Sequence, residues 1–267
     1  MNKKEFQRLL QQAEAGDIEA QYHLGACYAS GRGVGQDDEQ AFGWFLRAAR
    51  QGHVEAQFSM SYCYEVGLGT KPDPGETFAW CLRAAQAGHV SAQFNLAIYY
   101  DDGLGTEKDC RKAAEWYLRA AEQGHTGAQY NLGVCYEQGE GCEQDLAEAV
   151  RWYRRAAVKG HAGAQNNLGS CYYEGKGIEQ NLTTAVEWFW LAAEQGHAEA
   201  QYRLGCCYLN GRGVGLNYAQ AHEWLRRAAE QENPAAQCTL GKCYYYGRGV
   251  KENLAEAVRW YRSAADN

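Results

Sequence analysis

Apolar residues recur along the chain at helical spacing, in two stretches that repeat together. The first stretch has the positions Ala20, Leu24, Cys27 and Tyr28, which return as Ala128, Leu132, Cys135 and Tyr136. The second stretch is represented by Ala113, Trp116, Tyr117, Ala120 and Ala121. Steps of three and four residues place each set on one side of a helix. The pattern therefore predicts two amphipathic helices, here named helix A and helix B, in every repeat.

Signals for helix ends flank both stretches. Helix A follows a polar residue that is expected to cap it, namely Asp17, His53, His89, His125, His161, His197 or Asn233. A Gly-x-Gly pair such as Gly139 and Gly141 ends helix A, because glycine adopts the positive φ that this end requires. Helix B follows the capping residues Asp37, Asp73, Asp109, Asp145, Asn181, Asn217 and Asn253. A capping box is expected where Glu or Gln stands three residues later, at Gln40, Glu76, Glu148, Gln220 and Glu256.

A fixed period of 36 residues runs through the chain. It is marked by seven tryptophans, Trp44, Trp80, Trp116, Trp152, Trp188, Trp224 and Trp260. A period of this length is typical of a solenoid, in which hairpins stack because one hairpin has no core of its own. Small residues such as Gly25 and Gly133 are expected to let neighbouring helices approach closely. The sequence therefore predicts an all-α fold of seven helix hairpins.

The repeated motif resembles a known one. The pattern A-x-x-x-L-G-x-x-Y-x-x-G-x-G, then D or N, then A-x-x-W-Y-x-x-A-A-x-x-G is similar to the Sel-1-like repeat, a relative of the tetratricopeptide repeat. The resemblance covers repeats at 17–52, 53–88, 89–124, 125–160, 161–196, 197–232 and 233–267. Residues 1–16 look like helix B of a preceding unit and are expected to form an N-terminal capping helix. The resemblance implies a right-handed α-solenoid superhelix that acts as an adaptor or scaffold, although fold analogy names no partner.

The cysteines indicate a reducing environment. Six of the eleven share one position of helix A, where the third copy has Tyr99: Cys27, Cys63, Cys135, Cys171, Cys207 and Cys243. Neighbouring copies lie roughly 10 Å apart, which is too far for a disulfide, so they are expected to be buried apolar residues. A secreted branch of the resembled family has a C-x7-C disulfide, but Ala49 and Gln57 stand at those positions here. We therefore expect a cytoplasmic protein, with no signal peptide or membrane span indicated.

Charge narrows the choice of partner. The formal net charge is −7, which argues against nucleic-acid binding. Arginine recurs on helix B at Arg47, Arg83, Arg119, Arg155 and Arg227. Because Glu115 and Glu223 precede two of them by four residues, a solvated outer face with ion pairs one turn apart is expected.

The residues that suggest chemistry are better explained by structure. Five histidines recur in Gly-His turns at the repeat spacing, whereas the ligands of one zinc ion lie about 2.0 to 2.3 Å from it. Gly-x-Gly follows a helix, while a phosphate loop follows a strand. Some cysteine-rich relatives have been discussed as β-lactamase-like, which requires Ser-x-x-Lys; the nearest stretch is TLGK at 239–242, inside a repeat helix. We therefore expect no catalytic residue, metal or cofactor, and a hydrolase is the least favoured alternative.

Partner recognition is expected on a concave helix A face, at positions that vary between repeats. By analogy with tetratricopeptide geometry, these positions hold aromatic rings, carboxylates and asparagines. The candidate partner-binding residues are Tyr22, Phe58, Tyr62, Glu65, Phe94, Asn95, Asp101, Asp102, Tyr130, Asn131, Glu137, Asn167, Tyr173 and Glu174. Such a groove suits a segment with Lys or Arg and apolar side chains. The alternative, equally open, is that the rings pack between helices and the acids are solvated.

The sequence as a whole predicts a non-enzymatic scaffold or adaptor. Its partner is expected to be a protein or peptide, basic where it meets units two to five, and neither nucleic acid nor membrane. One alternative function is that of a bacterial immunity protein, which wraps a toxic effector. The last helix B ends in WYRSAADN with no polar helix after it, which predicts either that a longer protein was truncated or that this end packs against a partner or a second copy of the chain, a self-association.

Overall fold

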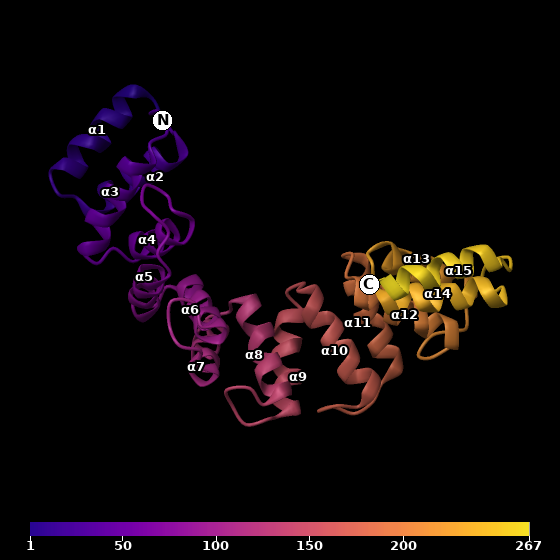
Figure 1. Cartoon of the computed structure of the whole chain (residues 1–267). Helices are drawn as coiled ribbons and strands as arrows, with labels where there is room; N and C mark the ends of the chain where they lie inside the picture. The colour runs from indigo at the N-terminus through magenta and orange to yellow at the C-terminus, as the bar shows by residue number, and fades with distance from the viewer. Residues whose placement is uncertain (267) are drawn as a thin grey trace. The chain divides into compact units, whose positions relative to one another are not determined.

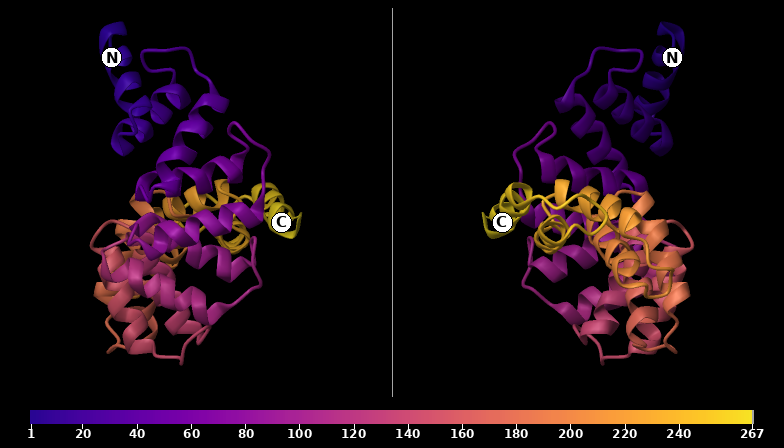
Figure 2. Two further views of the ribbon diagram at one scale, coloured as in Figure 1. Left: turned by 90° about the vertical axis from the view of Figure 1, so that its left-hand side faces the viewer. Right: turned by 90° about the vertical axis from the view of Figure 1, so that its right-hand side faces the viewer.

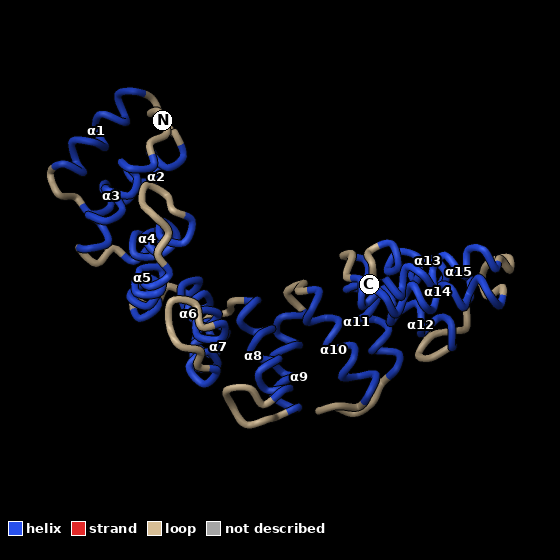
Figure 3. Tube along the Cα trace, in the orientation of Figure 1, coloured by secondary structure: helices blue, strands red, loops and turns tan. Residues whose placement is uncertain are grey.

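The computed structural model describes residues 1–266, which form helices and connecting loops without any strand in that range (Figure 3). The helices are α1 (Lys3–Glu14), α2 (Ile18–Ser30), α3 (Asp38–Arg50), α4 (Val54–Val66), α5 (Pro74–Gln86), α6 (Val90–Asp102), α7 (Cys110–Glu122), α8 (Thr126–Gln138), α9 (Leu146–Ala157), α10 (Ala162–Glu174), α11 (Leu182–Glu194), α12 (Ala198–Asn210), α13 (Tyr218–Glu230), α14 (Pro234–Tyr246) and α15 (Leu254–Asp266). From α2 onward, even numbers are helix A and odd numbers are helix B. The all-α fold of seven helix hairpins is confirmed.

The predicted caps of helix A are present. In α4, Nδ1 of His53 accepts a hydrogen bond from the Ala56 N–H at 3.0 Å, and Asn233 does the same for Ala236 in α14 through its side-chain oxygen at 2.8 Å. Each cap satisfies one of the amides that a helix start leaves without a partner. The other end is closed by a left-handed glycine, such as Gly67 with φ of 80° after α4.

The predicted capping boxes of helix B are wrong. Asp37 and its equivalents do accept from the third amide of the helix, at 2.9 Å for Gln40. The reciprocal bond is missing because the cap's own N–H is already used: Asp37 N–H donates to the carbonyl of Tyr28 at 3.1 Å, and Asp73 donates to Tyr64 at 3.0 Å. Helix B is thereby tied to helix A of the same hairpin, a contact that a local sequence pattern does not reveal.

Contacts between residues divide the chain, whose helices are labelled in Figure 1, into two units. The first consists of Met1–Ala128 with the loop segment Glu140–Cys142, and the second of Gln129–Gly139 with the residues from Glu143 onward. In the first unit each helix from α1 to α7 packs on the next along the chain, and in the second unit the same holds from α9 to α15, with the two helices of a hairpin side by side (Figure 2).

The core of each unit is built between consecutive hairpins. In the first unit, Phe45 of helix B packs with Met60 and Cys63 of the next helix A and with Trp80 of the next helix B. In the second unit, Phe189, Leu204, Cys207 and Trp224 occupy the same positions. Burial of the repeated cysteine position, as predicted, holds for all six copies, and all eleven cysteines are free thiols.

A buried glutamine also links neighbouring hairpins. In the first unit, the amide of Gln93 donates to the carbonyl of Ala85 at 3.2 Å, and its oxygen accepts from Gln123 at 2.6 Å. The same arrangement joins Gln165 to Gln195 and Gln201 to Gln231 in the second unit. Because these amides are buried, their pairing is worth more than that of a surface hydrogen bond.

Candidate functional site

The face formed by helices A carries almost all of its charge as carboxylate in the first unit. Neither α4 nor α6 contains Lys or Arg, whereas Glu65, Asp101 and Asp102 stand at their C-terminal ends. Asp102 is exposed and Asp101 half-buried. No Lys or Arg among residues 1–266 lies within ion-pair distance of these three acids. Of the three acids, Glu65 accepts a long hydrogen bond from the Tyr99 hydroxyl, with 3.5 Å between the two oxygens.

The aromatic row packs between repeats. Tyr22, Phe58, Phe94 and Tyr130 each stack on the capping histidine of the next repeat, with ring centroids 4.6, 4.3, 4.3 and 4.6 Å apart. In two repeats the same histidine reaches a carboxylate through Nε2, at 3.3 Å from His53 to Glu19 and 3.1 Å from His89 to Glu55. Of the two interpretations of the aromatic row, the packing role is therefore present, and contact with a partner stays a prediction.

A hollow of about 250 Å³ lies on this face in the first unit. It is lined by Ala29, Phe45, Phe58, Ser59, Tyr62, Cys63 and Leu68. Tyr62 is 53% exposed and is therefore the most accessible of the predicted aromatic residues at this hollow. An apolar side chain of a partner could lie against Tyr62 while a cation on the same segment reaches the nearby carboxylates.

The equivalent hollow in the second unit differs in charge. It measures about 210 Å³ and is lined by Tyr173, Phe189, Glu199, Tyr202, Arg203, Cys206 and Cys207. Arg203 pairs with Glu199 at 2.8 Å and lies 3.9 Å from Glu174, which also pairs with Lys176 at 2.5 Å. The guanidinium of Arg212 covers the ring of Tyr173 at 4.6 Å. The predicted residues Tyr173 and Glu174 are thus already engaged within the protein.

Glu137, the remaining predicted acid of the second unit, is held by a buried tyrosine. The hydroxyl of Tyr153 donates to its carboxylate, and burial together with this acid raises the pKa of Tyr153. The predicted asparagines Asn95, Asn131 and Asn167 are half-buried on α6, α8 and α10. Asn167 accepts from Asn166 at 3.2 Å. Within the predicted set, carboxylates without a Lys or Arg partner among residues 1–266 and the exposed ring of Tyr62 are thus found on helices A of the first unit.

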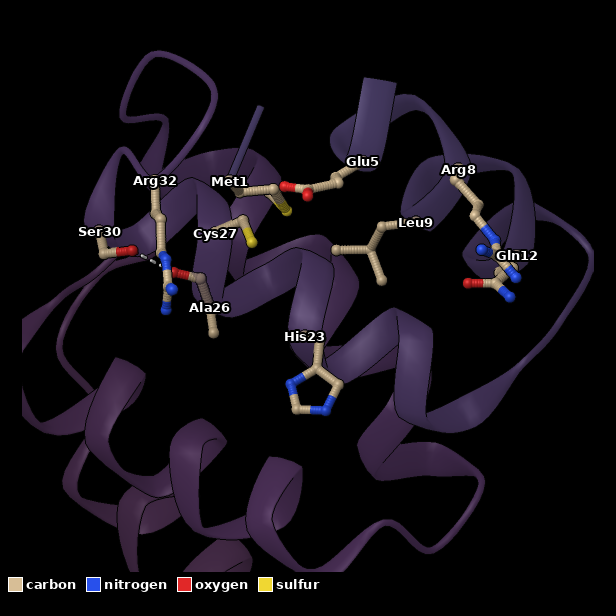
Figure 4. A pocket seen from close by; sticks show the side chains of 10 residues that line it. All are labelled: Met1, Glu5, Arg8, Leu9, Gln12, His23, Ala26, Cys27, Ser30 and Arg32. Carbon is tan, nitrogen blue, oxygen red and sulfur yellow. Dashed lines mark hydrogen bonds between the residues drawn. The ribbon is translucent and has the colours of Figure 1, made fainter. Parts of the chain in front are cut away.

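Sequence reasoning missed a hollow of about 660 Å³ between α1 and α2 (Figure 4). Its lining includes Glu5, Arg8, His23 and Cys27. Burial raises the pKa of the Cys27 thiol, so this cysteine is protonated at neutral pH and is not an activated nucleophile. The repeat could have revealed this hollow in the sequence. His23, Ala26 and Cys27 are the equivalents, one repeat earlier, of Ser59, Tyr62 and Cys63, which line the hollow of about 250 Å³.

Among residues 1–266, no group of three or more His, Cys, Asp or Glu side chains is placed to hold a metal ion. In the same range, each helix is too short or too polar to cross a lipid bilayer.

The capping histidines of the second unit make its stability pH-dependent. Burial lowers the pKa of His161 and of His197, and His197 lowers that of His161 further. Their Nδ1 atoms accept from Ala164 and Ala200 at 3.1 and 3.2 Å, which an imidazolium cannot do. The unfolded chain binds protons near pH 6.5 while the folded protein resists them, so the free energy of unfolding falls as the pH decreases below about 6.5.

This prediction can be checked with thermal unfolding at pH 7.5 and 5.5. We expect the double variant His161→Asn/His197→Asn to lose less stability between the two values than the parent, because asparagine caps α14 in the same way without titrating. An unchanged loss in the variant would show that these two caps do not carry the effect.

Stacked helix hairpins with a fixed period define this protein as an α-solenoid of the helical-repeat class. The Sel1 repeat profile matches residues 18–53, 54–89, 90–125, 126–161, 162–197, 198–233 and 234–267, each beginning one residue later than the repeat set from the sequence. The chain belongs to the Sel1 repeat family. Proteins of this family generally mediate protein–protein interactions.

Solved structures agree with this assignment. The chain is 34% identical to c5321, a protective antigen of uropathogenic Escherichia coli with an SLR fold, with a TM-score of 0.89 over 98% of this chain and 56% of that one. It is 32% identical to a Sel1 repeat protein from Oxalobacter formigenes, with a TM-score of 0.79 over 98% and 75% of the two chains. The chain thus spans little more than half the length of the E. coli protein. No match was found among curated proteins.

A more distant similarity concerns the immunity alternative. Immunity protein Pa5087 from Pseudomonas aeruginosa is 23% identical, with a TM-score of 0.45 over 80% of this chain and 82% of that one. A similarity at this level says nothing about function. The immunity role therefore stays a prediction.

Proposed function

We propose that the chain is a non-enzymatic protein-interaction module whose first unit binds a basic, partly apolar segment of a partner protein. The observation that carries this proposal is the set of three carboxylates, Glu65, Asp101 and Asp102, on helices without Lys or Arg. Because no Lys or Arg among residues 1–266 pairs with them, a partner's Lys or Arg gains attraction without having to displace such an ion pair. Tyr62, one turn before Glu65 on α4, supplies exposed apolar area on the same helix.

The mode of binding follows from exposure. Exposed ion pairs contribute only about 0 to 1 kcal/mol each, so the acids select and orient the partner, and apolar contact at Tyr62 supplies much of the affinity. Binding should therefore weaken with salt, because charges at the surface are screened within about 8 Å at physiological ionic strength. We also place the protein in a reducing compartment, a proposal supported by its eleven free thiols.

Charge reversal tests the proposal. In Glu65→Lys/Asp101→Lys/Asp102→Lys we expect a labelled peptide of alternating lysine and leucine to bind at least about tenfold more weakly than to the parent, a loss equivalent to two or three surface ion pairs. Fluorescence anisotropy measures the affinity, and the same variant is used for capture of the native partner. The matched control is Glu39→Lys/Glu107→Lys/Glu122→Lys, which changes the net charge equally at exposed acids of α3, α7 and the loop before α7.

The control separates a site from a general charge effect. If both triple variants lose affinity equally, the attraction comes from net charge and the proposed face is wrong. If neither loses affinity, the acids do not bind the partner at all.

A further inference from the structure

A second charged surface lies on the helices B of the first unit. Arg47, Arg83 and Arg119 hold equivalent positions on α3, α5 and α7, each three residues after a tryptophan. Their guanidinium carbons lie over the indole rings of Trp44, Trp80 and Trp116 at 4.3, 4.3 and 4.2 Å from the ring centroids. The three tryptophans are only 7 to 8% exposed, whereas the three arginines are exposed. We name these three arginines the arginine row.

The arginine row differs from the ion-paired surface that the sequence suggested. Glu115 stands four residues before Arg119, but Arg119 forms no ion pair with Glu115 among the described residues. Its guanidinium stacks on the ring of Trp116. Among the described residues, no carboxylate lies within ion-pair distance of any member of the row. The second unit has no such row, because Leu191 replaces the middle arginine and Arg227 pairs with Glu223 at 3.0 Å. The expected pair one turn apart is thus found for Arg227 and is wrong for Arg119.

Stacking prepares these arginines for binding. A buried indole fixes the plane of each guanidinium, which removes much of the conformational entropy that a free arginine loses when it binds. One flat face is covered, and the N–H groups at the edge remain available for a two-pronged contact with a carboxylate. Three fixed, unpaired cations therefore make a better anion-binding surface than three mobile ones.

We propose that the arginine row binds an acidic helical segment of a protein. The three guanidinium groups occupy the same position of α3, α5 and α7, so they recur once per hairpin. A helix with an acidic residue at every seventh position carries a line of carboxylates along one side, about 10.5 Å from one to the next, and this line is complementary in charge to the arginine row. A nucleic acid is a less suitable ligand, because its dense phosphate charge is repelled at long range by a protein with a net charge of −7. This surface lies on helices B, so it is independent of the helix A face proposed above.

Neighbouring charges predict an order among the three arginines. Arg50 lies one turn beyond Arg47 on α3 and adds positive charge, whereas Glu115 and Glu122 flank Arg119 on α7. We therefore expect Arg47→Gln to weaken binding more than Arg119→Gln does. This order distinguishes the row from a diffuse attraction, which would make the single changes equal.

The test uses the full chain and a labelled helical peptide of about 21 residues with glutamate at every seventh position. We expect Arg47→Gln/Arg83→Gln/Arg119→Gln to bind it about tenfold more weakly than the parent, equivalent to three surface ion pairs. The variant Arg47→Lys/Arg83→Lys/Arg119→Lys keeps the charges but loses the planar contacts. Its affinity for the peptide should therefore lie between that of the parent and that of the glutamine triple variant. The control Lys71→Gln/Arg111→Gln/Lys251→Gln removes the same charge from exposed positions elsewhere and should bind like the parent.

Circular dichroism establishes that each variant is folded. If a triple variant does not fold, the affinities of the single variants are compared in its place. The proposal is overturned if the control loses as much affinity as the glutamine triple, or if the parent does not bind the peptide. Tighter binding of a single-stranded oligonucleotide than of the peptide would also overturn it, in favour of a nucleic-acid surface.

Discussion

Gly105→Ala is expected to lower the free energy of unfolding by roughly 3 to 5 kcal/mol, the larger of the two main effects that the structure predicts. Gly105 is the second glycine of a Gly-x-Gly pair and has φ of 68°. A Cβ atom there would lie 2.0 Å from the carbonyl oxygen of Pro74, in the first turn of the preceding helix B. Backbone on both sides of this contact would have to move, because no flexible side chain can yield.

The control for this substitution is Gly88→Ala in the same unit. Gly88 also has a positive φ, 95°, but a Cβ there would meet nothing within 4 Å. We expect it to cost only the conformational penalty of about 1 to 2 kcal/mol. Thermal unfolding followed by circular dichroism compares the two, with a difference in Tm of several degrees expected at roughly 2 to 4 °C per kcal/mol. Equal costs would mean that backbone conformation, and not close packing between repeats, fixes this glycine.

Gln123→Ala is expected to cost about 1 to 3 kcal/mol, because it leaves the buried oxygen of Gln93 without a donor. Another repeat of the chain naturally lacks this donor. One repeat earlier, Ala87 stands where Gln123 would be, and the buried oxygen of Gln57 has no hydrogen-bond partner among residues 1–266. Ala87→Gln should therefore stabilise the protein by about 1 kcal/mol.

A double variant shows whether the amide pair carries the effect. In a Gln93→Leu background, Gln123→Ala should cost much less than in the parent, because no buried acceptor is left to satisfy. Gln86→Ala, at a neighbouring exposed position of α5, should change stability by less than about 0.5 kcal/mol. Denaturant unfolding of the four variants measures these differences. An unchanged cost in the Gln93→Leu background would contradict the pairing.

The two proposed surfaces of the first unit have opposite charge. Glu65, Asp101 and Asp102 belong to helices A, whereas Arg47, Arg83 and Arg119 belong to helices B. Glu65 and Asp101 stand one repeat apart, as the three arginines do, and within residues 1–266 no ion pair involves either set. A scaffold with this arrangement can hold a basic segment and an acidic one at the same time, and the two triple variants test each surface without altering the other.

The sequence by itself determined the helices, their ends and the number of hairpins. Capping by His53 and Asp37, the left-handed glycine after helix A and burial of the repeated cysteine all depend on neighbours within a few residues or on a strict period. Helix formation is governed by such local terms, so a single sequence with seven copies of one pattern predicts them well.

Only the tertiary structure decided which predicted residues remain free to bind. Tyr22 stacks on His53 and Gln123 pairs with Gln93 across about 30 residues of sequence. The carboxylate of Glu137 accepts a hydrogen bond from Tyr153, whereas no Lys or Arg among residues 1–266 pairs with Asp102, although the sequence offered both as candidate acids of the same surface. These contacts depend on how successive hairpins pack against each other. The partner of a side chain in the next repeat is determined by this packing and not by spacing along the chain, so a local sequence pattern does not predict it.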